Sequence, residues 1–312
     1  MVGLHSRDFD LKWMKKILLS DGIPKRSVAS IFGPPGVGKT TLCKKLYTDE
    51  RVVSYFSIRA WVTIPQRYNV QQLLCHLLQS MRPPVNEIEM GSTVSQLKEQ
   101  LHKHLKCKRY LIVLDDVPNT LVWDDIQQCF PNDSNGSRIF LTTLFSDVAK
   151  LGGLFSLLLP FLTDNESWDL FCHRFSHNQY MAPKFKEIAE RLVEECKGLP
   201  RSIVTVADRL SKCNYTLKEW KRIEKELHSL GILHKDVQHL NPPDMIKENL
   251  KTLVCAMQIH LRHLKQGSRF CCQLSWSDAL LRLSLLPSGF NKRECAINFR
   301  YLTSLSTVCE VL

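Results

Sequence analysis

Residues 33–40 read Gly33-Pro34-Pro35-Gly36-Val37-Gly38-Lys39-Thr40, and this stretch decides the fold of the chain around it. It matches the pattern G-x-x-x-x-G-K-[ST] of a phosphate-binding loop, called the P-loop below. Gly36 and Gly38 lack a Cβ, so the backbone can bend around a phosphate with its N–H groups pointing inward. The helix that follows would add the positive end of its dipole. Lys39 is expected to reach the β- and γ-phosphates of a nucleotide.

A phosphate-binding loop of this type lies between a strand and a helix, and the residues on either side of the P-loop predict both. Residues 27–32 form an apolar run that predicts a buried strand, and residues 40–47 predict the helix after the loop. A glycine-rich turn arising by chance is the alternative, but the strand, the helix and the Lys-Thr pair together argue against it. We predict Mg²⁺ at the Thr40 hydroxyl and nucleotide phosphates at Gly33, Gly36, Val37, Gly38, Lys39, Thr40 and Thr41.

An acidic pair, Asp115-Asp116, comes directly after the continuous apolar run 110–114. Such a run is typical of a central parallel strand, and ligands bind at the carboxyl ends of such strands. Asp115 is expected to hold Mg²⁺, directly or through water, and Asp116 to act catalytically by orienting a water against the γ-phosphate. The alternative is that the pair starts a turn, because residues 117–119 have turn chemistry. Beside a P-loop, the metal role is preferred.

Strand and helix patterns alternate along the first 160 residues and then give way to helices alone. Further strands are predicted at 56–62, 138–142 and 157–159, and a further helix at 70–81. This alternation predicts an α/β fold with a doubly wound parallel sheet of the P-loop NTPase type in residues 1–160. A capping box at Thr163–Glu166 opens a helix and, with the patterns at 185–197, 199–212 and 217–230, predicts a small helical subdomain over residues 161–230. The fold of residues 231–312 is left open, although residues 245–265 have a helical pattern.

Composition and charge exclude several classes of protein. The 312 residues, 44% hydrophobic and 23% charged, are typical of a soluble chain of two or three domains. There is no run of eighteen apolar residues for a membrane span and no secretory signal at the start, so we expect a cytoplasmic protein. The twelve cysteines show no zinc-type spacing and are expected to be reduced thiols. The net charge of +11 raises the question of nucleic acid, but the densest basic cluster, residues 103–109, is better interpreted as a solvated helix end.

With these motifs the chain resembles the nucleotide-binding NB-ARC domain of plant disease-resistance proteins of the coiled-coil (NLR) class. The similar segments, in the order of that family, are Val2-Gly3, residues 56–66, residues 111–117 with Trp123-Asp124-Asp125, residues 136–143, residues 162–168 and Gly198-Leu199-Pro200. Ordered agreement over residues 2–230 is far more specific than a P-loop alone.

The resemblance implies a molecular switch that holds ADP at rest and ATP when active. It also implies that Val2 lines the adenine pocket and that Pro200 closes over the base. An ordinary proline in the first turn of a helix is an equally good explanation of Pro200 taken alone. Other NLR-type immune receptors or signalling proteins are the implied protein partners.

The chain also departs from the family pattern. Leu144 stands where the family has an arginine facing the γ-phosphate; losing such a bond, worth about 1.5–3 kcal/mol, would weaken discrimination of ATP from ADP by roughly ten- to a hundredfold. Arg201 replaces a leucine, and Pro34-Pro35 should stiffen the loop. Residues 231–312 contain no Met-His-Asp motif, and a signalling domain and leucine-rich repeats are not found. We interpret the chain as a truncated or divergent family member.

Three functions remain open at this point. The first is a nucleotide-binding switch in plant defence with slow or no ATP hydrolysis. The second is a turnover P-loop enzyme, either a kinase or a nucleic-acid-dependent ATPase; the sequence shows neither an arginine-rich lid nor a concentrated basic groove. The third is an interaction fragment that binds other immune receptors without switching.

Overall fold

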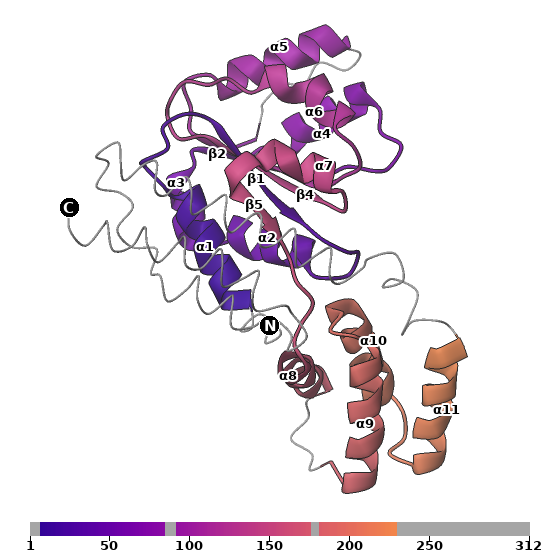
Figure 1. Cartoon of the computed structure of the whole chain (residues 1–312). Coiled ribbons are helices and arrows are strands. Elements are labelled where there is room, and N and C mark those ends of the chain that lie inside the picture. The colour runs from indigo at the N-terminus through magenta and orange to yellow at the C-terminus, as the bar shows by residue number, and fades with distance from the viewer. Residues whose placement is uncertain (1–6, 85–91, 176–180, 230–312) are drawn as a thin grey trace, which may run out of the picture. The chain divides into compact units, whose positions relative to one another are not determined.

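The computed structural model of this chain describes residues 7–84, 92–175 and 181–229 (Figure 1). Val2 and residues 231–312, with the helix expected at 245–265, lie outside the described residues. Within the described segments none of the helices combines the length and the hydrophobicity that a membrane span requires. The seven cysteines in the described ranges are all free.

The centre of the first 160 residues is a five-stranded sheet in which every pairing is parallel. Its strand order is β2-β3-β4-β1-β5, and its strands are β1 (Ser27–Phe32), β2 (Ile58–Thr63), β3 (Tyr110–Val117), β4 (Arg138–Thr143) and β5 (Ser156–Leu158). This confirms the predicted doubly wound α/β fold. β3 is longer than predicted, because it continues through Asp115, Asp116 and Val117 rather than ending at Leu114.

Helices connect these strands. They are α1 (Asp8–Leu18), α2 (Lys39–Tyr47), α3 (Glu50–Tyr55), α4 (Val70–Ser80), α5 (Val94–Leu105), α6 (Leu121–Ile126) and α7 (Ser146–Ala149), with the 3₁₀ helices η2 (Gln127–Cys129) and η3 (Lys150–Phe155). The sequence predicted α2 and α4 but not α1, α3, α5, α6 or α7. For α5 a signal was present, because Thr93 and Gln96 form a capping box.

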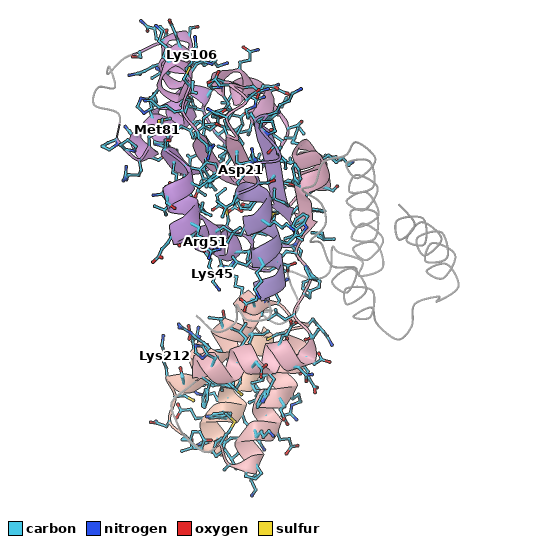
Figure 2. The ribbon with its side chains drawn as sticks, turned by 90° about the vertical axis from the view of Figure 1, so that its left-hand side faces the viewer. Asp21, Lys45, Arg51, Met81, Lys106 and Lys212 are labelled. Carbon is cyan, nitrogen blue, oxygen red and sulfur yellow. The ribbon has the colours of Figure 1, made fainter. Side chains whose placement is uncertain are left out.

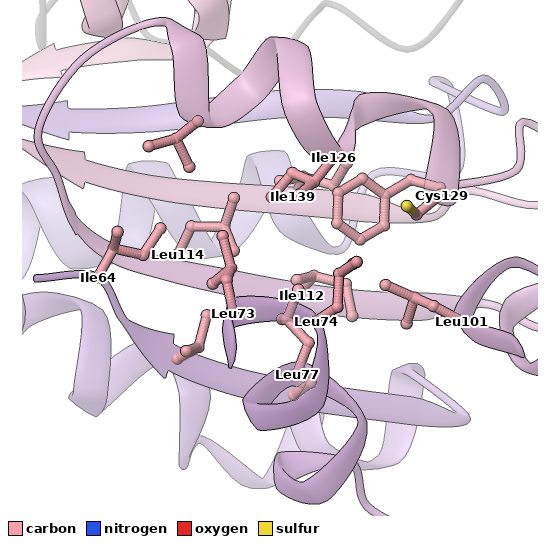
Figure 3. Close-up of a cluster of buried hydrophobic side chains, with 14 of the residues drawn as sticks. Ile64, Leu73, Leu74, Leu77, Leu101, Ile112, Leu114, Ile126, Cys129 and Ile139 are labelled. Carbon is pink, nitrogen blue, oxygen red and sulfur yellow. The ribbon is translucent and has the colours of Figure 1, made fainter. Parts of the chain in front are cut away.

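The two faces of the sheet are buried under different helices. Along β3, Ile112 and Leu114 belong to one hydrophobic cluster, which includes residues of α4, α5 and α6 (Figure 3). Leu111 and Val113 belong to a second cluster, which includes residues of α1, α2 and α3. Successive side chains of a strand point to opposite faces, so a strand covered on both sides must be apolar throughout. This is why residues 110–114 show no polar alternation.

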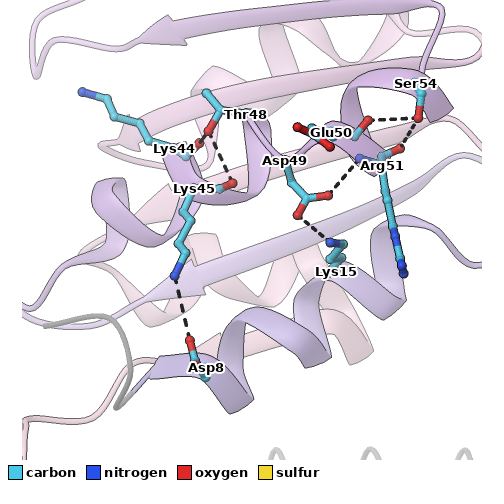
Figure 4. A network of polar contacts seen from close by, with 9 residues as sticks. All are labelled: Asp8, Lys15, Lys44, Lys45, Thr48, Asp49, Glu50, Arg51 and Ser54. Atoms are coloured by element: carbon cyan, nitrogen blue, oxygen red, sulfur yellow. Dashed lines mark hydrogen bonds and ion pairs between the residues drawn. The ribbon is translucent and has the colours of Figure 1, made fainter. Parts of the chain in front are cut away.

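Charged side chains join α1 to α2 and α3 (Figure 4). Lys15 Nζ donates to Asp49 Oδ2 at 2.5 Å, while Asp49 Oδ1 caps α3 by accepting from the Arg51 N–H. Lys45 of α2 extends toward Asp8 of α1, at 3.8 Å. Met14 and Leu18 of α1 are fully buried. The N-terminal helix therefore packs on the same sheet face as the P-loop helix α2.

Four helices follow the sheet and enclose a hydrophobic cluster of their own: α8 (Asp164–Phe175), α9 (Pro183–Glu195), α10 (Pro200–Ser211) and α11 (Leu217–Ser229). The predicted capping box is present, because Glu166 Oε2 accepts from the Thr163 N–H at 2.7 Å and the Glu166 N–H donates to Thr163 Oγ1 at 3.4 Å. Trp220 is fully buried, and its ring meets Phe175 and Phe185 edge to face. The four helical patterns in residues 163–230 are thus confirmed.

Candidate functional site

The P-loop connects β1 to α2 through three glycines with positive φ: Gly33 (146°), Gly36 (76°) and Gly38 (103°). A Cβ on Gly38 would meet no heavy atom within 4 Å, so the loop is open on the side that Gly38 faces. Gly38 is also the N-cap of α2, a helix of nine residues. Its conformation is one that residues with a side chain rarely adopt. Glycine at 38 thus keeps open a concave backbone that leads directly into the N-terminus of a helix.

Lys39 is the first residue of α2, and its side chain folds back over the P-loop. Its Nζ donates to the carbonyl oxygens of Gly33 and Pro34 at 2.9 and 3.0 Å, and the residue is only 5% exposed. Burial lowers the pKa of Lys39 to about 8, and the negative charges of Asp116 and Asp115 only partly oppose this effect. A buried ammonium held by two carbonyl dipoles is incompletely compensated, and an anion on the loop would complete the compensation.

Asp115 is buried beside the P-loop helix, at 2% exposure, and three threonine hydroxyls surround it. Its Oδ1 accepts from Thr40 Oγ1 at 2.9 Å and from Thr142 Oγ1 at 2.5 Å, and its Oδ2 lies 3.5 Å from Thr63 Oγ1. The structure therefore brings the two predicted metal residues, Thr40 and Asp115, into direct contact. Because the Thr40 hydroxyl uses its proton for Asp115, its oxygen lone pairs are left for a cation.

Asp116 faces a different environment from its neighbour. A register irregularity between Leu114 and Val117 interrupts the pairing of β3 with β4, and Asp116 has a φ of 58°. Its N–H donates to Thr142 Oγ1 at 2.9 Å, so Thr142 contacts both acidic residues. Such an irregularity re-aims side chains. Here Asp115 is directed inward, while Asp116 is exposed and lines a cavity. Partial desolvation, followed by the charge of Asp115, raises the pKa of Asp116, and Lys39 acts in the opposite direction.

The cavity has a volume of about 1310 Å³. Its first wall comes from the P-loop and from the carboxyl ends of β2, β3 and β4, and its second wall comes from α8 and α10. Among the predicted site residues, its lining includes Gly36, Val37, Gly38, Lys39, Thr40, Thr41, Asp116 and Pro200. Gly33 and Asp115 are not part of the lining; they contact it through Lys39 and Thr40. Val2 lies outside the described residues.

The segment Gly198-Leu199-Pro200 joins the helical region to the P-loop. Gly198 has a φ of 73°, and a Cβ there would lie 2.2 Å from the Leu162 carbonyl oxygen. Leu199 is buried in the same hydrophobic cluster as α1 and α2. Pro200 occupies the first turn of α10 and lines the cavity. The position of Pro200 agrees both with an ordinary helix-start proline and with a residue placed over a ligand.

Several residues of the site were given no role from the sequence. Thr63 and Thr142 lie at the carboxyl ends of β2 and β4, so polar residues at the ends of neighbouring parallel strands were the available signal. Arg7 lines the cavity and donates to the Pro160 carbonyl and, at 3.5 Å, to that of Val37. Arg174 and Asp208 form a bidentate pair across α8 and α10, at 2.6 and 3.1 Å. No pattern in one sequence pairs residues that lie so far apart along the chain.

The donor set of this site fits a phosphate with a divalent cation. The described residues contain no group of three or more His, Cys, Asp or Glu side chains able to hold a metal ion by themselves. Mg²⁺ is usually bound through one or two protein oxygens together with substrate phosphates and waters. Thr40 and Asp115 are such oxygens, and Lys39 with the loop N–H groups supplies the donors for phosphate.

Comparison with known proteins shows the family to which this chain belongs. The NB-ARC domain model matches residues 9–180. The chain belongs to the NB-ARC family. Over 216 residues it is 38% identical to a putative late blight resistance protein homolog of Solanum demissum, covering 67% of this chain and 17% of that protein. The late blight resistance protein R1-A of the same species is 37% identical over 226 residues, covering 71% of this chain and 17% of that protein.

The NB-ARC chain described here thus spans about a sixth of the length of these curated relatives. A solved structure of similar fold is the Aeropyrum pernix ORC2 protein in its ADPNP-ADP complexes, with a TM-score of 0.51 and 16% identity, covering 72% of this chain and 70% of that one. At that identity the likeness concerns the fold alone. The family and the fold support nucleotide binding at the P-loop of the NB-ARC domain.

Proposed function

We propose that this NB-ARC chain is an ADP/ATP-binding molecular switch of plant innate immunity that acts by conformational change with slow or no ATP hydrolysis. The observation that supports the proposal most is the cavity shared by the P-loop and the first turn of α10. A ligand on the loop would contact both regions, so the state of the ligand can influence how they pack. The resistance-protein relatives support the role in defence.

The residues of the first wall have defined tasks in this proposal. Lys39 would exchange its two carbonyl partners for phosphate oxygens, and Thr40 and Asp115 would hold Mg²⁺, Asp115 directly or through water. Mg²⁺, when bound, neutralises phosphate charge. Asp116 would orient a water at the end of the phosphate chain, and Pro200 would lie against the base. We further propose residues 1–160 as the nucleotide-binding domain, 161–230 as the helical subdomain and 231–312 as a divergent region, in a cytoplasmic protein.

Nucleotide binding by the whole purified chain tests the proposal. We expect ADP or ATP to copurify with the wild-type protein in a native mass measurement. Lys39→Ala should lower affinity for both nucleotides by roughly a hundredfold or more, because it removes the ammonium of the P-loop. Lys44→Ala, on the exposed face of the same helix, is the matched control and should bind normally. Equal affinity of Lys39→Ala and wild type by calorimetry would refute the proposal.

A turnover ATPase is the second candidate, and the exposed carboxylate of Asp116 in the cavity is the observation in its favour. Steady-state hydrolysis of many ATP molecules per chain, with or without DNA, would favour it over a switch. An interaction fragment that binds other immune receptors is the alternative if no nucleotide copurifies and none binds.

A further inference from the structure

Arg201 on α10 places an exposed guanidinium at the cavity. It follows Pro200, and its side chain is exposed and lines the same cavity as Lys39, Thr40 and Asp116. None of the hydrogen bonds or ion pairs found within the described ranges involves its guanidinium. An arginine side chain offers five N–H donors in a planar fork that matches the geometry of phosphate.

The base of this side chain is held against the P-loop. The Arg201 N–H donates to the Gly36 carbonyl at 3.2 Å. A Cβ built on Gly36 would lie 2.9, 3.3 and 3.7 Å from the Cβ, Cδ and Cγ of Arg201, so the aliphatic stem covers Gly36 directly. Contact along the stem restricts the positions open to the guanidinium and lowers the entropy lost when it binds a ligand.

Three other cations that line the cavity have protein partners. Lys39 is bonded to two carbonyls, Arg7 to the Val37 and Pro160 carbonyls, and Arg174 to Asp208. Lys212, next to the end of α10 (Figure 2), has Asp208 in its field; the pKa of Asp208 is lowered first by the Arg174 hydrogen bond and also by the charge of Lys212. Of the arginines in the described residues that line the cavity, Arg201 is thus the one whose guanidinium is left for an external anion.

The first wall of the cavity is apolar where the chain leaves the carboxyl end of β4. Leu144 and Phe145 follow β4 and line the cavity with apolar side chains that are 42% and 51% exposed. Apolar groups at this position cannot distinguish a triphosphate from a diphosphate by charge. Any charge-based preference has to come from another part of the cavity.

We propose that Arg201 binds a phosphate of the nucleotide and sets the preference of this chain for a triphosphate over a diphosphate. The inference rests on the proposed function, because it requires a nucleotide on the P-loop. A triphosphate carries an additional charge, so a cation that contacts its terminal phosphate favours it over a diphosphate. Because Arg201 belongs to α10 and Lys39 to α2, the same phosphate chain would join the two walls of the cavity.

The test compares Arg201→Leu with wild type in the full chain. Dissociation constants for ADP and for a non-hydrolysable ATP analogue are measured by calorimetry with Mg²⁺. We expect the variant to bind the ATP analogue about tenfold or more weakly and ADP at most about threefold more weakly. Arg201→Lys should retain part of the preference. Arg209→Leu, an exposed arginine of the same helix that pairs with Glu226, is the matched control and should leave both constants unchanged.

A second measurement shows that the contact is with phosphate. Tripolyphosphate and pyrophosphate compete for the site without a base or a sugar, and Arg201→Leu should weaken tripolyphosphate more than pyrophosphate. An equal loss for both nucleotides, no loss for either, or an equal loss for tripolyphosphate and pyrophosphate would overturn the inference while leaving nucleotide binding intact. If the wild-type chain binds no nucleotide, the proposed function itself fails and this inference fails with it.

Discussion

The two walls of the cavity hold their polar side chains in different ways. On the sheet side, Lys39, Asp115 and Thr142 are at most 5% exposed and are held by short hydrogen bonds. On the helical side, Arg174 and Arg201 are exposed, and the ion pair of Arg174 with Asp208 lies on the surface. Exposed pairs contribute little to stability, whereas buried networks hold one geometry.

This difference suggests a division of tasks between the walls. A rigid, pre-organised wall is suited to hold a phosphate group that every nucleotide state shares. A wall of exposed charges on separate helices is suited to respond to what differs between the states.

The largest change is expected in the stability of a variant at Gly198, before the first turn of α10. Gly198→Ala would place a methyl group 2.2 Å from the Leu162 oxygen at a φ of 73°, and we expect it to destabilise folding by about 3 kcal/mol. Gly38→Ala, with open space around it, should cost only about 1 kcal/mol of stability. Its methyl would nevertheless intrude on the phosphate side of the loop and weaken nucleotide binding. Denaturant unfolding measures the loss of stability in each variant, and calorimetry measures the loss of nucleotide affinity. Full nucleotide affinity in Gly38→Ala would contradict the assignment of residues 33–40 as the phosphate-binding loop.

The pH dependence of binding reports on the buried lysine. In the free protein Lys39 loses its proton near its pKa of about 8, whereas bound phosphate would hold the ammonium form. Affinity should therefore be nearly full below about pH 7, about half of that at pH 8 and more than about tenfold lower by pH 9.5, with a proton taken up on binding above pH 8. Calorimetry in buffers of different ionisation enthalpy measures this uptake. Lys39→Arg stays charged and should lose the pH dependence; a flat profile in wild type would show that the lysine is not desolvated.

The threonine that contacts both acidic residues should affect binding only through the cation. Thr142→Val removes the hydroxyl that donates to Asp115 and accepts from the Asp116 N–H, so nucleotide affinity with Mg²⁺ should fall about tenfold. Affinity in EDTA should be unchanged. Thr142→Ser keeps the hydroxyl and serves as the control. If the loss is the same with and without Mg²⁺, Thr142 has a packing role only.

The smallest effect is expected at the apolar edge of the rigid wall. Leu144→Arg introduces a cation beside the cavity, and we expect ATP affinity to rise about threefold to tenfold more than ADP affinity. Leu144→Met is the neutral control of similar volume. Calorimetric titrations give the dissociation constants for ATP and for ADP. An equal change in both constants would mean that position 144 does not face the end of the phosphate chain.

The P-loop and the core of the sheet could be predicted from the sequence because their signals are local. The spacing of Gly36, Gly38 and Lys39 and the apolar run before Asp115 each follow from contacts within a few residues. The helix α3 was missed because it is short and is positioned by contacts with distant residues, such as Asp49 with Lys15. For α1 a local signal was present, because Leu11, Met14 and Leu18 recur at helical spacing. Sequence reasoning assigned Mg²⁺ to Asp115 and a water to Asp116, but it did not predict that Asp115 is buried while Asp116 is exposed and lines the cavity.

The amino-acid sequence alone determined that the chain has a phosphate-binding loop on a parallel sheet followed by helices, since backbone freedom and hydrophobic period are properties of neighbouring residues. Only the tertiary structure decided which groups share the cavity. The irregularity in β3 turns Asp116 outward, the three threonines converge on Asp115 from separate elements, and Arg201 lies over Gly36 from a distant part of the sequence. Such contacts form between residues that are far apart in the sequence, and the packing of the helices and strands that carry them decides which residues meet.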